Sequence, residues 1–229
     1  MKTILITGSN RGIGLGLVRH YLKSGWRVFA ASREPGKSGD LRALEKEHGD
    51  RLVSVKLDVA SEQSIFDLAL ALNDLKLDIV INNAGVAMDE NLGQWTSAAF
   101  STCLAVNVTG PALIAQVLVP LMKPGSKLIN MSSGLGSLDL NINPETGMDA
   151  YAMSKAALNM LTRRLAAKLE SRGITVISIS PGWVKTDMGG DEAPVLVEDS
   201  VNAMTGVFEG LTLEHSGRFF ASHGEPTPW

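Results

Sequence analysis

The stretch ILITGSNRGIG, residues 4–14, joins a short apolar run to a glycine-rich turn. Three consecutive apolar residues at its start indicate a buried strand. After the turn, apolar residues recur at helical spacing, at Leu15, Val18 and Leu22. The turn glycines, Gly8, Gly12 and Gly14, permit a tight turn and let backbone N–H groups at a helix N-terminus approach an anion. This strand–turn–helix order predicts a site for the pyrophosphate of a dinucleotide.

The same alternation continues along the chain. Apolar runs predict strands at 2–7, 26–31, 51–57, 78–84, 127–133 and 174–180, with a short strand near 217–221. Amphipathic stretches predict helices that include 12–23, 61–72, 150–170 and 198–211. Continuously apolar strands are typical of a parallel sheet that helices cover on both faces. We therefore predict one α/β domain over residues 1–229, a doubly wound Rossmann fold with about seven mostly parallel strands.

Composition narrows the class of protein. Hydrophobic residues make up 45% of the chain, charged residues 20%, and the formal charge is -3, so neither nucleic acid nor a membrane surface is an expected partner. The only cysteine, Cys103, excludes an internal disulfide, and the four histidines lack metal-ligand spacing, so we expect no metal site. No apolar run is long enough for a membrane span or a signal peptide. We expect a cytoplasmic protein.

Further polar motifs stand where the predicted strands end. They are Asp58-Val59, NNAG at 82–85, Ser132-Ser133, YAMSK at 151–155, and PGWVKTDMGG at 181–190. Taken singly, Asp58 also suits a helix N-cap and NNAG a turn. Together with TGSNRGIG, whose Gly-x-x-x-Gly-x-Gly spacing departs from G-x-G-x-x-G, they resemble the short-chain dehydrogenase/reductase family. The resemblance covers essentially the whole chain and is strongest to the carbonyl-reductase branch of sniffer and the C-factor-like proteins.

The resemblance implies a cofactor site at these strand ends. Its residues would be Gly8, Asn10, Arg11, Gly12, Ile13, Gly14, Ser32, Arg33, Asp58, Val59, Asn83, Ala84, Gly85, Tyr151, Lys155, Pro181, Gly182, Val184 and Thr186. Ser32 stands where an acid would bind the ribose hydroxyls of NAD, and Arg33 suits the 2′-phosphate of NADP. Arg11 adds a second positive charge, as it does in NADP-using members. We favour NADP(H), although Glu34 remains the alternative acid for NAD.

The resemblance also implies a catalytic set of Asn107, Ser133, Tyr151 and Lys155. Residues four apart on a helix share a face, so the Tyr151 phenol and the Lys155 ammonium point the same way. We choose Ser133 over Ser132 because the family places its active serine three residues before a glycine. In a partly dehydrated cleft, a charge at ~5 Å supplies about 3 kcal/mol, so we expect Lys155 to lower the pKa of Tyr151.

The expected activity is NADPH-dependent reduction of an aldehyde, ketone or quinone, with Tyr151 as proton donor. A dinucleotide-binding signalling protein of C-factor type is the alternative, and an NAD-dependent alcohol or steroid dehydrogenase is a third possibility. Association into a homodimer or tetramer is expected through the Tyr151 helix and the segment after Asn91.

Two departures from the family concern the substrate side. Ser133 and Tyr151 are eighteen residues apart instead of the usual thirteen, which predicts an enlarged loop over residues 134–149. The segment 183–210 should form part of the substrate site, beginning with a mobile loop. Candidate residues for an apolar pocket are Leu135, Leu138, Met148, Trp183 and Met188.

Overall fold

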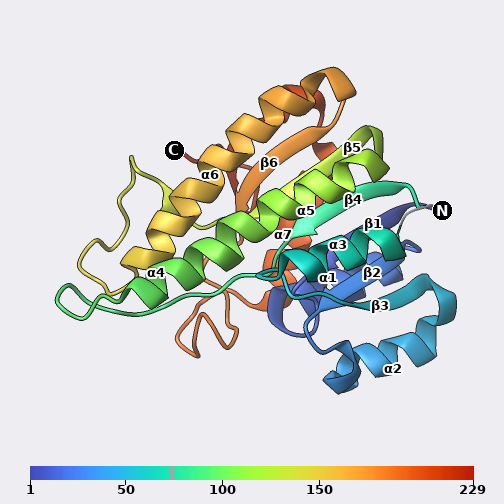
Figure 1. Cartoon of the computed structure of the whole chain (residues 1–229), viewed down its shortest axis with the longest axis horizontal. Helices are drawn as coiled ribbons and strands as arrows, with labels where there is room; N and C mark the ends of the chain where they lie inside the picture. The colour runs from blue at the N-terminus through green and yellow to red at the C-terminus, as the bar shows by residue number, and fades with distance from the viewer. Residues whose placement is uncertain (73–74) are drawn as a thin grey trace.

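A computed structural model describes residues 1–72 and 75–229. Seven strands form one sheet in the order β3-β2-β1-β4-β5-β6-β7, and each neighbouring pair is parallel (Figure 1). The strands are β1 (Thr3–Thr7), β2 (Arg27–Ser32), β3 (Leu52–Lys56), β4 (Leu77–Asn82), β5 (Met122–Met131), β6 (Thr175–Ser180) and β7 (Phe219–Ala221). The strand order reverses between β1 and β4, which is where such a sheet binds its ligand. The predicted doubly wound α/β fold is confirmed.

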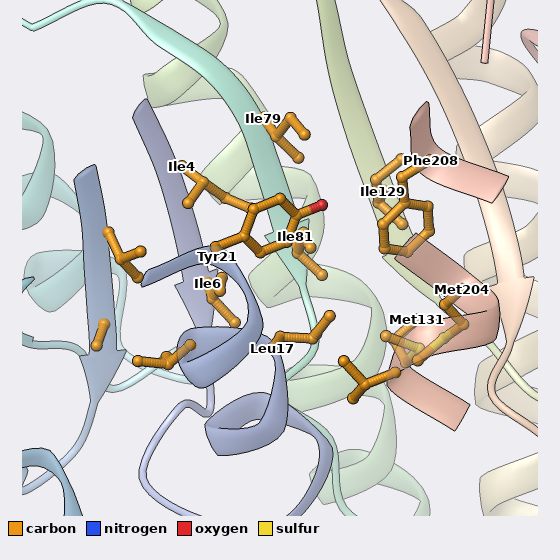
Figure 2. Packing of buried hydrophobic residues seen from close by; sticks show 14 of the residues in the cluster. Ile4, Ile6, Leu17, Tyr21, Ile79, Ile81, Ile129, Met131, Met204 and Phe208 are labelled. Carbon is orange, nitrogen blue, oxygen red and sulfur yellow. The ribbon is translucent and has the colours of Figure 1, made fainter. Parts of the chain in front are cut away.

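Helices cover both faces of the sheet. The helices are α1 (Gly12–Lys23), α2 (Gly39–His48), α3 (Glu62–Ala71), α4 (Ser97–Leu104), α5 (Gly110–Leu118), α6 (Asp149–Leu169) and α7 (Val197–Gly210). Alternate strand residues point to opposite faces of the sheet. Ile4 and Ile6 of β1 pack with α1 and α7, as Figure 2 shows, whereas Leu5 packs with α3 and α5. This period of two explains why strands buried on both faces read as continuously apolar.

Side-chain caps decide where several helices begin. The hydroxyls of Ser38, Ser61 and Thr96 accept N–H bonds from the first turns of α2, α3 and α4. Because Ser61 caps α3, the N-cap alternative for Asp58 is wrong. The Asp58 carboxylate instead accepts a hydrogen bond from the Ala60 N–H at 3.0 Å.

Among the described residues, one helical segment, Ser97–Leu121, is long and apolar enough to cross a membrane by length and composition alone, although polar residues interrupt it. In the fold, its second half packs Ile114 and Leu118 into the core below the sheet, and α4 lies against α6. Figure 1 shows α4 and α5 in green beside the yellow-orange α6. The segment therefore serves as a core helix here.

Most strands differ from their predicted boundaries by one or two residues, and the largest difference is at β5, which begins at Met122 instead of residue 127. Between Met122 and Lys127 the register of β5 against β4 shifts, and Gly125 within this irregularity has a φ angle of +85°. β4 ends at Asn82, and the N–H of Asn83 turns to the Thr7 hydroxyl at 3.0 Å. The loop expected after Pro181 is tied at its base, where Val184 bridges Val195 and the Lys185 N–H donates to the Val195 carbonyl.

Candidate active site

A cavity of about 510 Å³ lies beyond the carboxyl ends of the central strands. Most of the predicted cofactor residues line it: Gly8, Asn10, Arg11, Gly12, Ile13, Gly14, Ser32, Arg33, Asp58, Val59, Asn83, Ala84, Gly85, Tyr151, Lys155, Pro181 and Thr186. Gly182 and Val184 are not among the lining residues, because Val184 pairs with Val195 and is 4% exposed. A role for those two in binding the nicotinamide stays a prediction.

The glycine turn is built for close backbone approach. Gly8 and Gly12 have φ angles of +64° and +52°, which side chains rarely adopt. A Cβ on Gly14 would lie 2.2 Å from the Gly8 carbonyl oxygen, and one on Gly8 would lie 2.8 Å from the Ala84 Cα. The first turn of α1 carries no acidic residue, so its positive dipole end faces the cavity uncompensated. The turn therefore fits a pyrophosphate.

Gly14→Ala is expected to destabilise the protein by about 1–3 kcal/mol and to abolish dinucleotide binding, because the new methyl group would collide with the Gly8 backbone. Urea unfolding and a fluorescence titration with dinucleotide measure the two effects. Gly36→Ala is the matched control, since a Cβ there would meet nothing within 4 Å. Unchanged dinucleotide binding by Gly14→Ala would contradict the prediction that the glycine turn holds the pyrophosphate.

The end of β2 offers donors for a phosphate. Ser32 is 4% exposed, and its hydroxyl has no hydrogen-bond partner among the described residues. An orphaned buried hydroxyl is costly unless a ligand or water satisfies it. Glu34, the alternative acid for NAD, forms an ion pair with Lys37 at 2.5 Å. A hydrogen bond from Lys37 and its positive charge lower the pKa of Glu34, so this carboxylate already has a cationic partner.

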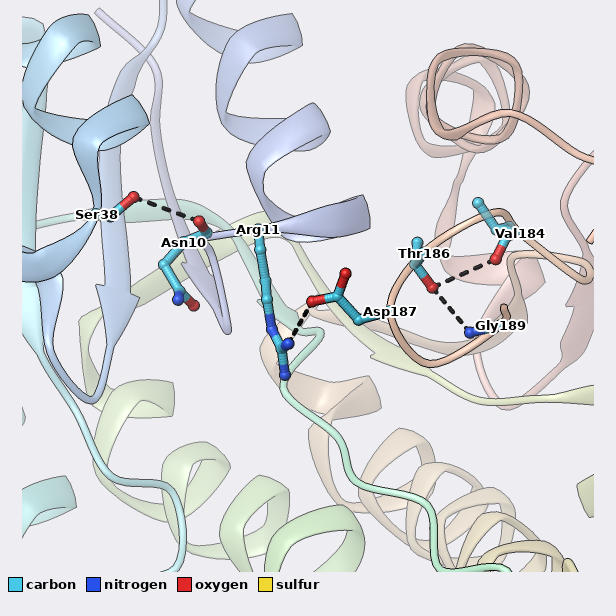
Figure 3. Close-up of polar contacts among 7 residues, drawn as sticks. All are labelled: Asn10, Arg11, Ser38, Val184, Thr186, Asp187 and Gly189. Atoms are coloured by element: carbon cyan, nitrogen blue, oxygen red, sulfur yellow. Dashed lines mark hydrogen bonds and ion pairs between the residues drawn. The ribbon is translucent and has the colours of Figure 1, made fainter. Parts of the chain in front are cut away.

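Arg11 lies across the mouth of the cavity from Asp187. Its guanidinium forms an ion pair with the Asp187 carboxylate, and both side chains line the cavity (Figure 3). The sequence placed Arg11 in the cofactor site but contained no sign of this partner. Asp187 is therefore a site residue that sequence reasoning missed.

Thr7 is a second missed residue. Its hydroxyl accepts hydrogen bonds from the N–H groups of Asn83 at 3.0 Å and Ala84 at 2.9 Å. The Asn83 side-chain amide donates in turn to the carbonyls of Thr7 and Gly8, at 2.8 and 3.2 Å. These bonds join the NNAG segment to the glycine turn. The threonine that precedes the turn glycines was the available signal.

Of the four predicted catalytic residues, Tyr151 and Lys155 line the cavity, whereas Ser133 and Asn107 are not among its lining residues. Tyr151 and Lys155 project from α6, and the Lys155 Nζ lies 5.4 Å from the centre of the Tyr151 ring. The Lys155 ammonium is 3% exposed and donates to the Met131 carbonyl at the end of β5, at 2.7 Å. The shared helix face that the spacing predicted therefore brings both side chains into the cleft.

The prediction that Lys155 lowers the pKa of Tyr151 is wrong when only the protein's own residues act on the phenol. Burial raises the pKa of Tyr151 to about 12, although a hydrogen bond with the Ser133 hydroxyl acts in the opposite direction. Burial also lowers the pKa of Lys155 to about 8. Desolvation outweighs the attraction between the two groups because neither charge is well hydrated in the cleft. The phenol therefore stays protonated at neutral pH.

The two adjacent serines have different environments. The Ser132 hydroxyl donates to the Asn159 side chain at 2.7 Å, and Ser132, although 2% exposed, lies in the wall of the cavity. The Ser133 hydroxyl lies close enough to the Tyr151 phenol to oppose the rise in its pKa, and it accepts the N–H of Leu135 at 3.2 Å. This geometry supports the choice of Ser133 as the residue beside the phenol.

Asn107 lies fully buried in a π-helical turn, Ala105–Thr109, between α4 and α5. Its amide nitrogen donates to the Val86 carbonyl at 2.8 Å and to the Ser154 hydroxyl at 2.9 Å, and its oxygen accepts the Val86 N–H at 2.9 Å. Ser154 donates to the Tyr151 carbonyl at 2.7 Å. The Asn107 side chain thus connects the helix of Tyr151 to the segment after NNAG. π-helical turns such as this one are often found near functional sites.

The enlarged loop leaves most of the predicted apolar pocket outside the cavity. Of the five candidates, only Met188 lines it, whereas Leu138 is 80% exposed. Ile142 folds back over Gly134, where an added Cβ would lie 3.0 Å from its Cδ1. The C-terminal segment holds the loop: the Ser137 hydroxyl donates to the Pro228 carbonyl, and the Asp139 N–H donates to the Trp229 carbonyl, both at 2.8 Å. No local pattern predicted this tie.

Lys155→Met is expected to remove a pH-dependent part of the stability. Burial lowers the Lys155 pKa from 10.5 to about 8, so the unfolded chain binds more protons than the folded one between these values. Stability therefore rises with pH in that window. Burying the protonated Lys155 lowers the free energy of unfolding by about 3 kcal/mol at neutral pH. About 2 kcal/mol of this loss is recovered by pH 9.5.

Urea unfolding at pH 7 to 9.5 measures this effect as the difference between wild type and Lys155→Met. Lys168→Met, on the exposed side of the same helix, is the control and should follow the wild-type profile. Parallel profiles for wild type and Lys155→Met would contradict the prediction.

Known proteins resemble this chain both in sequence and in fold. The family model described as short chain dehydrogenase matches residues 2–194. The chain is 39% identical to C-signal of Myxococcus xanthus over 156 residues, 67% of this chain and 93% of that protein. It is 33% identical to Short chain dehydrogenase gsfK of Penicillium aethiopicum over 251 residues, 99% of each chain.

Solved structures match over the whole chain. The NADPH-bound carbonyl reductase from chicken fatty liver superposes with a TM-score of 0.92 and 36% identity, covering 100% of this chain and 99% of that one. Carbonyl reductase Sniffer of D. melanogaster gives a TM-score of 0.91 and 32% identity, with full coverage of both chains. The likeness therefore extends beyond the glycine turn to the C-terminal elements.

Proposed function

The chain belongs to the short-chain dehydrogenase/reductase family, and on that premise we propose that it is an NADPH-dependent reductase of a small carbonyl compound. The observation that carries the proposal is that Tyr151 and Lys155 line the same cavity as the glycine turn, with the Ser133 hydroxyl close to the Tyr151 phenol. The NADP-bound structures among its structural neighbours support the choice of cofactor.

Different residues of the chain would hold different parts of the cofactor. The N-terminus of α1 and the glycine turn would receive the pyrophosphate. Ser32, Arg33 and Arg11 would receive the 2′-phosphate, for which guanidinium groups are well suited. When bound, the reduced nicotinamide supplies a hydride to the carbonyl carbon of the substrate.

Tyr151 donates its phenolic proton to the carbonyl oxygen, and Ser133 donates a hydrogen bond to the same oxygen as negative charge develops there. Hydride and proton together convert the carbonyl to an alcohol. Because burial raises the pKa of Tyr151 to about 12, the phenol is kept in the form that donates. A protonated phenol is the form that the reduction step requires.

Lys155 stabilises the phenolate that remains after proton transfer, because its ammonium lies beside the ring in a poorly hydrated cleft. Asn107 holds the start of α6 in place through Ser154 and Val86. It acts as a positioning residue, since its side-chain groups are already engaged within the protein.

The substrate class is an aldehyde, ketone or quinone. We propose that residues 1–229 act as one domain, and that the segment 183–210 forms part of the substrate site through Met188. The enlarged loop carries exposed apolar side chains, Leu138, Leu140 and Ile142, and we expect substrates with an apolar body.

A second candidate function is a dinucleotide-binding signalling protein with little turnover. The 39% identity to C-signal over 67% of the chain favours it. The two candidates differ in turnover, because a sensor needs the cofactor site without a competent proton donor.

The test is the loss of NADPH absorbance across a panel of aldehydes, ketones and quinones, with NADH in parallel. Turnover with NADPH supports the reductase and ranks its substrates. Tight NADPH binding without turnover on any carbonyl would overturn it in favour of the signalling function.

Two expectations about the protein's setting remain proposals. A homodimer would form through α4 and α6, on which Leu104, Met153 and Met160 are 41%, 58% and 58% exposed. Light scattering after gel filtration tests this assembly. A cytoplasmic location is tested by cell fractionation.

A further inference from the structure

The contact between Arg11 and Asp187 joins two parts of the chain that lie on either side of the cavity. Arg11 belongs to the glycine turn, whereas Asp187 belongs to the turn that follows β6 (Figure 3). Their side chains are 68% and 72% exposed, so neither is held by packing. Both also line the cavity that we assign to the dinucleotide.

The turn that carries Asp187 is well fixed. The Thr186 hydroxyl donates to the Val184 carbonyl at 3.3 Å and accepts the Gly189 N–H at 3.1 Å. The Thr186 methyl group is seated against the glycine turn, since a Cβ on Gly12 would lie 3.4 Å from it. The backbone of Asp187 is therefore held at a defined position beside the cavity.

The backbone around Arg11 is held as well. The carbonyl of Asn10 accepts a hydrogen bond from the Ser38 hydroxyl at 3.3 Å, and Gly12 follows with a positive φ angle. What can move is the long Arg11 side chain, whose guanidinium can bind a carboxylate or a phosphate in the same planar geometry. One guanidinium thus has two anions within its reach once a 2′-phosphate is present.

We propose that Asp187 is a specificity-determining residue that occupies Arg11 in place of the 2′-phosphate of NADPH. This inference rests on the proposed function, in which Arg11 receives that phosphate. NADPH must displace the carboxylate of Asp187 to gain Arg11, whereas NADH has no such phosphate and leaves the pair intact. Asp187 therefore reduces the preference for NADPH over NADH below the value that Arg11 and Arg33 would otherwise produce.

The expected effect is modest because the pair is exposed. Exposed ion pairs are worth up to about 1 kcal/mol, which corresponds to about a two- to fivefold change in Kd. Asp187→Asn should tighten the binding of NADPH by about this factor and leave the Kd for NADH unchanged. Salt should weaken the difference, since it screens exposed charges.

The experiment measures Kd by calorimetry for NADPH, NADH and adenosine 2′,5′-bisphosphate. The proteins are wild type, Asp187→Asn, Arg11→Gln and the double variant. In the Arg11→Gln background, Asp187→Asn should no longer change the Kd for NADPH. Asp187→Glu, which keeps the charge, should retain the wild-type ratio of the two Kd values. Asp191→Asn, an exposed acid of the same loop, controls for a change in net charge alone.

The outcomes separate this inference from the proposed function. If wild type prefers NADPH but Asp187→Asn leaves the ratio of Kd values unchanged, the inference fails and the reductase proposal stands. Weaker binding of both cofactors by Asp187→Asn would also overturn it, because Asp187 would then clamp the bound dinucleotide. If Arg11→Gln does not weaken NADPH binding, Arg11 does not meet the 2′-phosphate and both proposals lose that contact.

Discussion

Tyr151→Phe is expected to lower kcat for carbonyl reduction by ~10²–10⁴-fold, the usual contribution of a positioned general acid. The variant keeps the ring that lies 5.4 Å from the Lys155 ammonium and removes only the hydroxyl. NADPH binding should therefore stay within about twofold of wild type, since the ring still lines the cavity. Stopped-flow or steady-state loss of NADPH absorbance measures kcat, and fluorescence titration measures Kd.

The chain contains matched controls for this loss. Tyr21, the other tyrosine, is 5% exposed in the core between α1 and the sheet, so Tyr21→Phe should retain turnover wherever the variant folds. Ser133→Ala should lower kcat, whereas Ser132→Ala should not, because the Ser132 hydroxyl is bonded to Asn159. Full turnover by Tyr151→Phe would exclude the mechanism and leave the fold assignment untouched.

The double variant Ser32→Asp/Arg33→Ala is expected to reverse the cofactor preference. A hydrogen bond to a charged group is worth about 1.5–3 kcal/mol, so the loss of Arg33 alone weakens NADPH binding by about 10–150-fold. The new carboxylate repels the 2′-phosphate and accepts the ribose hydroxyls of NADH. The ratio of kcat/KM for NADPH over NADH should fall by ~10²–10³-fold in steady-state assays.

Arg42→Ala is the control for this reversal, because Arg42 is an exposed arginine of α2 that does not line the cavity. The ratio of kcat/KM for NADPH over NADH in Arg42→Ala should match that of wild type. An unchanged ratio in the double variant would mean that the end of β2 does not bind the 2′-phosphate, and Glu34 would need to be reconsidered despite its ion pair with Lys37.

Local patterns predicted the fold and most of the cavity. The glycine turn could be located because its strand–turn–helix order is contiguous, and every residue from Asn10 to Gly14 lines the cavity. Tyr151 and Lys155 could be paired because helical spacing alone decides which residues share a face. Parallel strands place their carboxyl ends at one edge, so motifs at successive strand ends had to converge.

Features that depend on distant contacts could not be predicted in this way. Arg11 and Asp187 are 176 positions apart, and no spacing rule links them. The tie between the enlarged loop and the C-terminal segment likewise joins Ser137 to Pro228.

The sequence by itself determined the order of strands and helices, the glycine cradle and the identity of the groups around the cavity, because periodicity and backbone freedom are local properties. The tertiary structure decided the electrostatic state of those groups. Tyr151 and Lys155 are both displaced toward their neutral forms, with pKa values of about 12 and 8. Burial sets this result, and burial depends on how β5, α4 and α6 pack against one another, which no local pattern in the sequence shows.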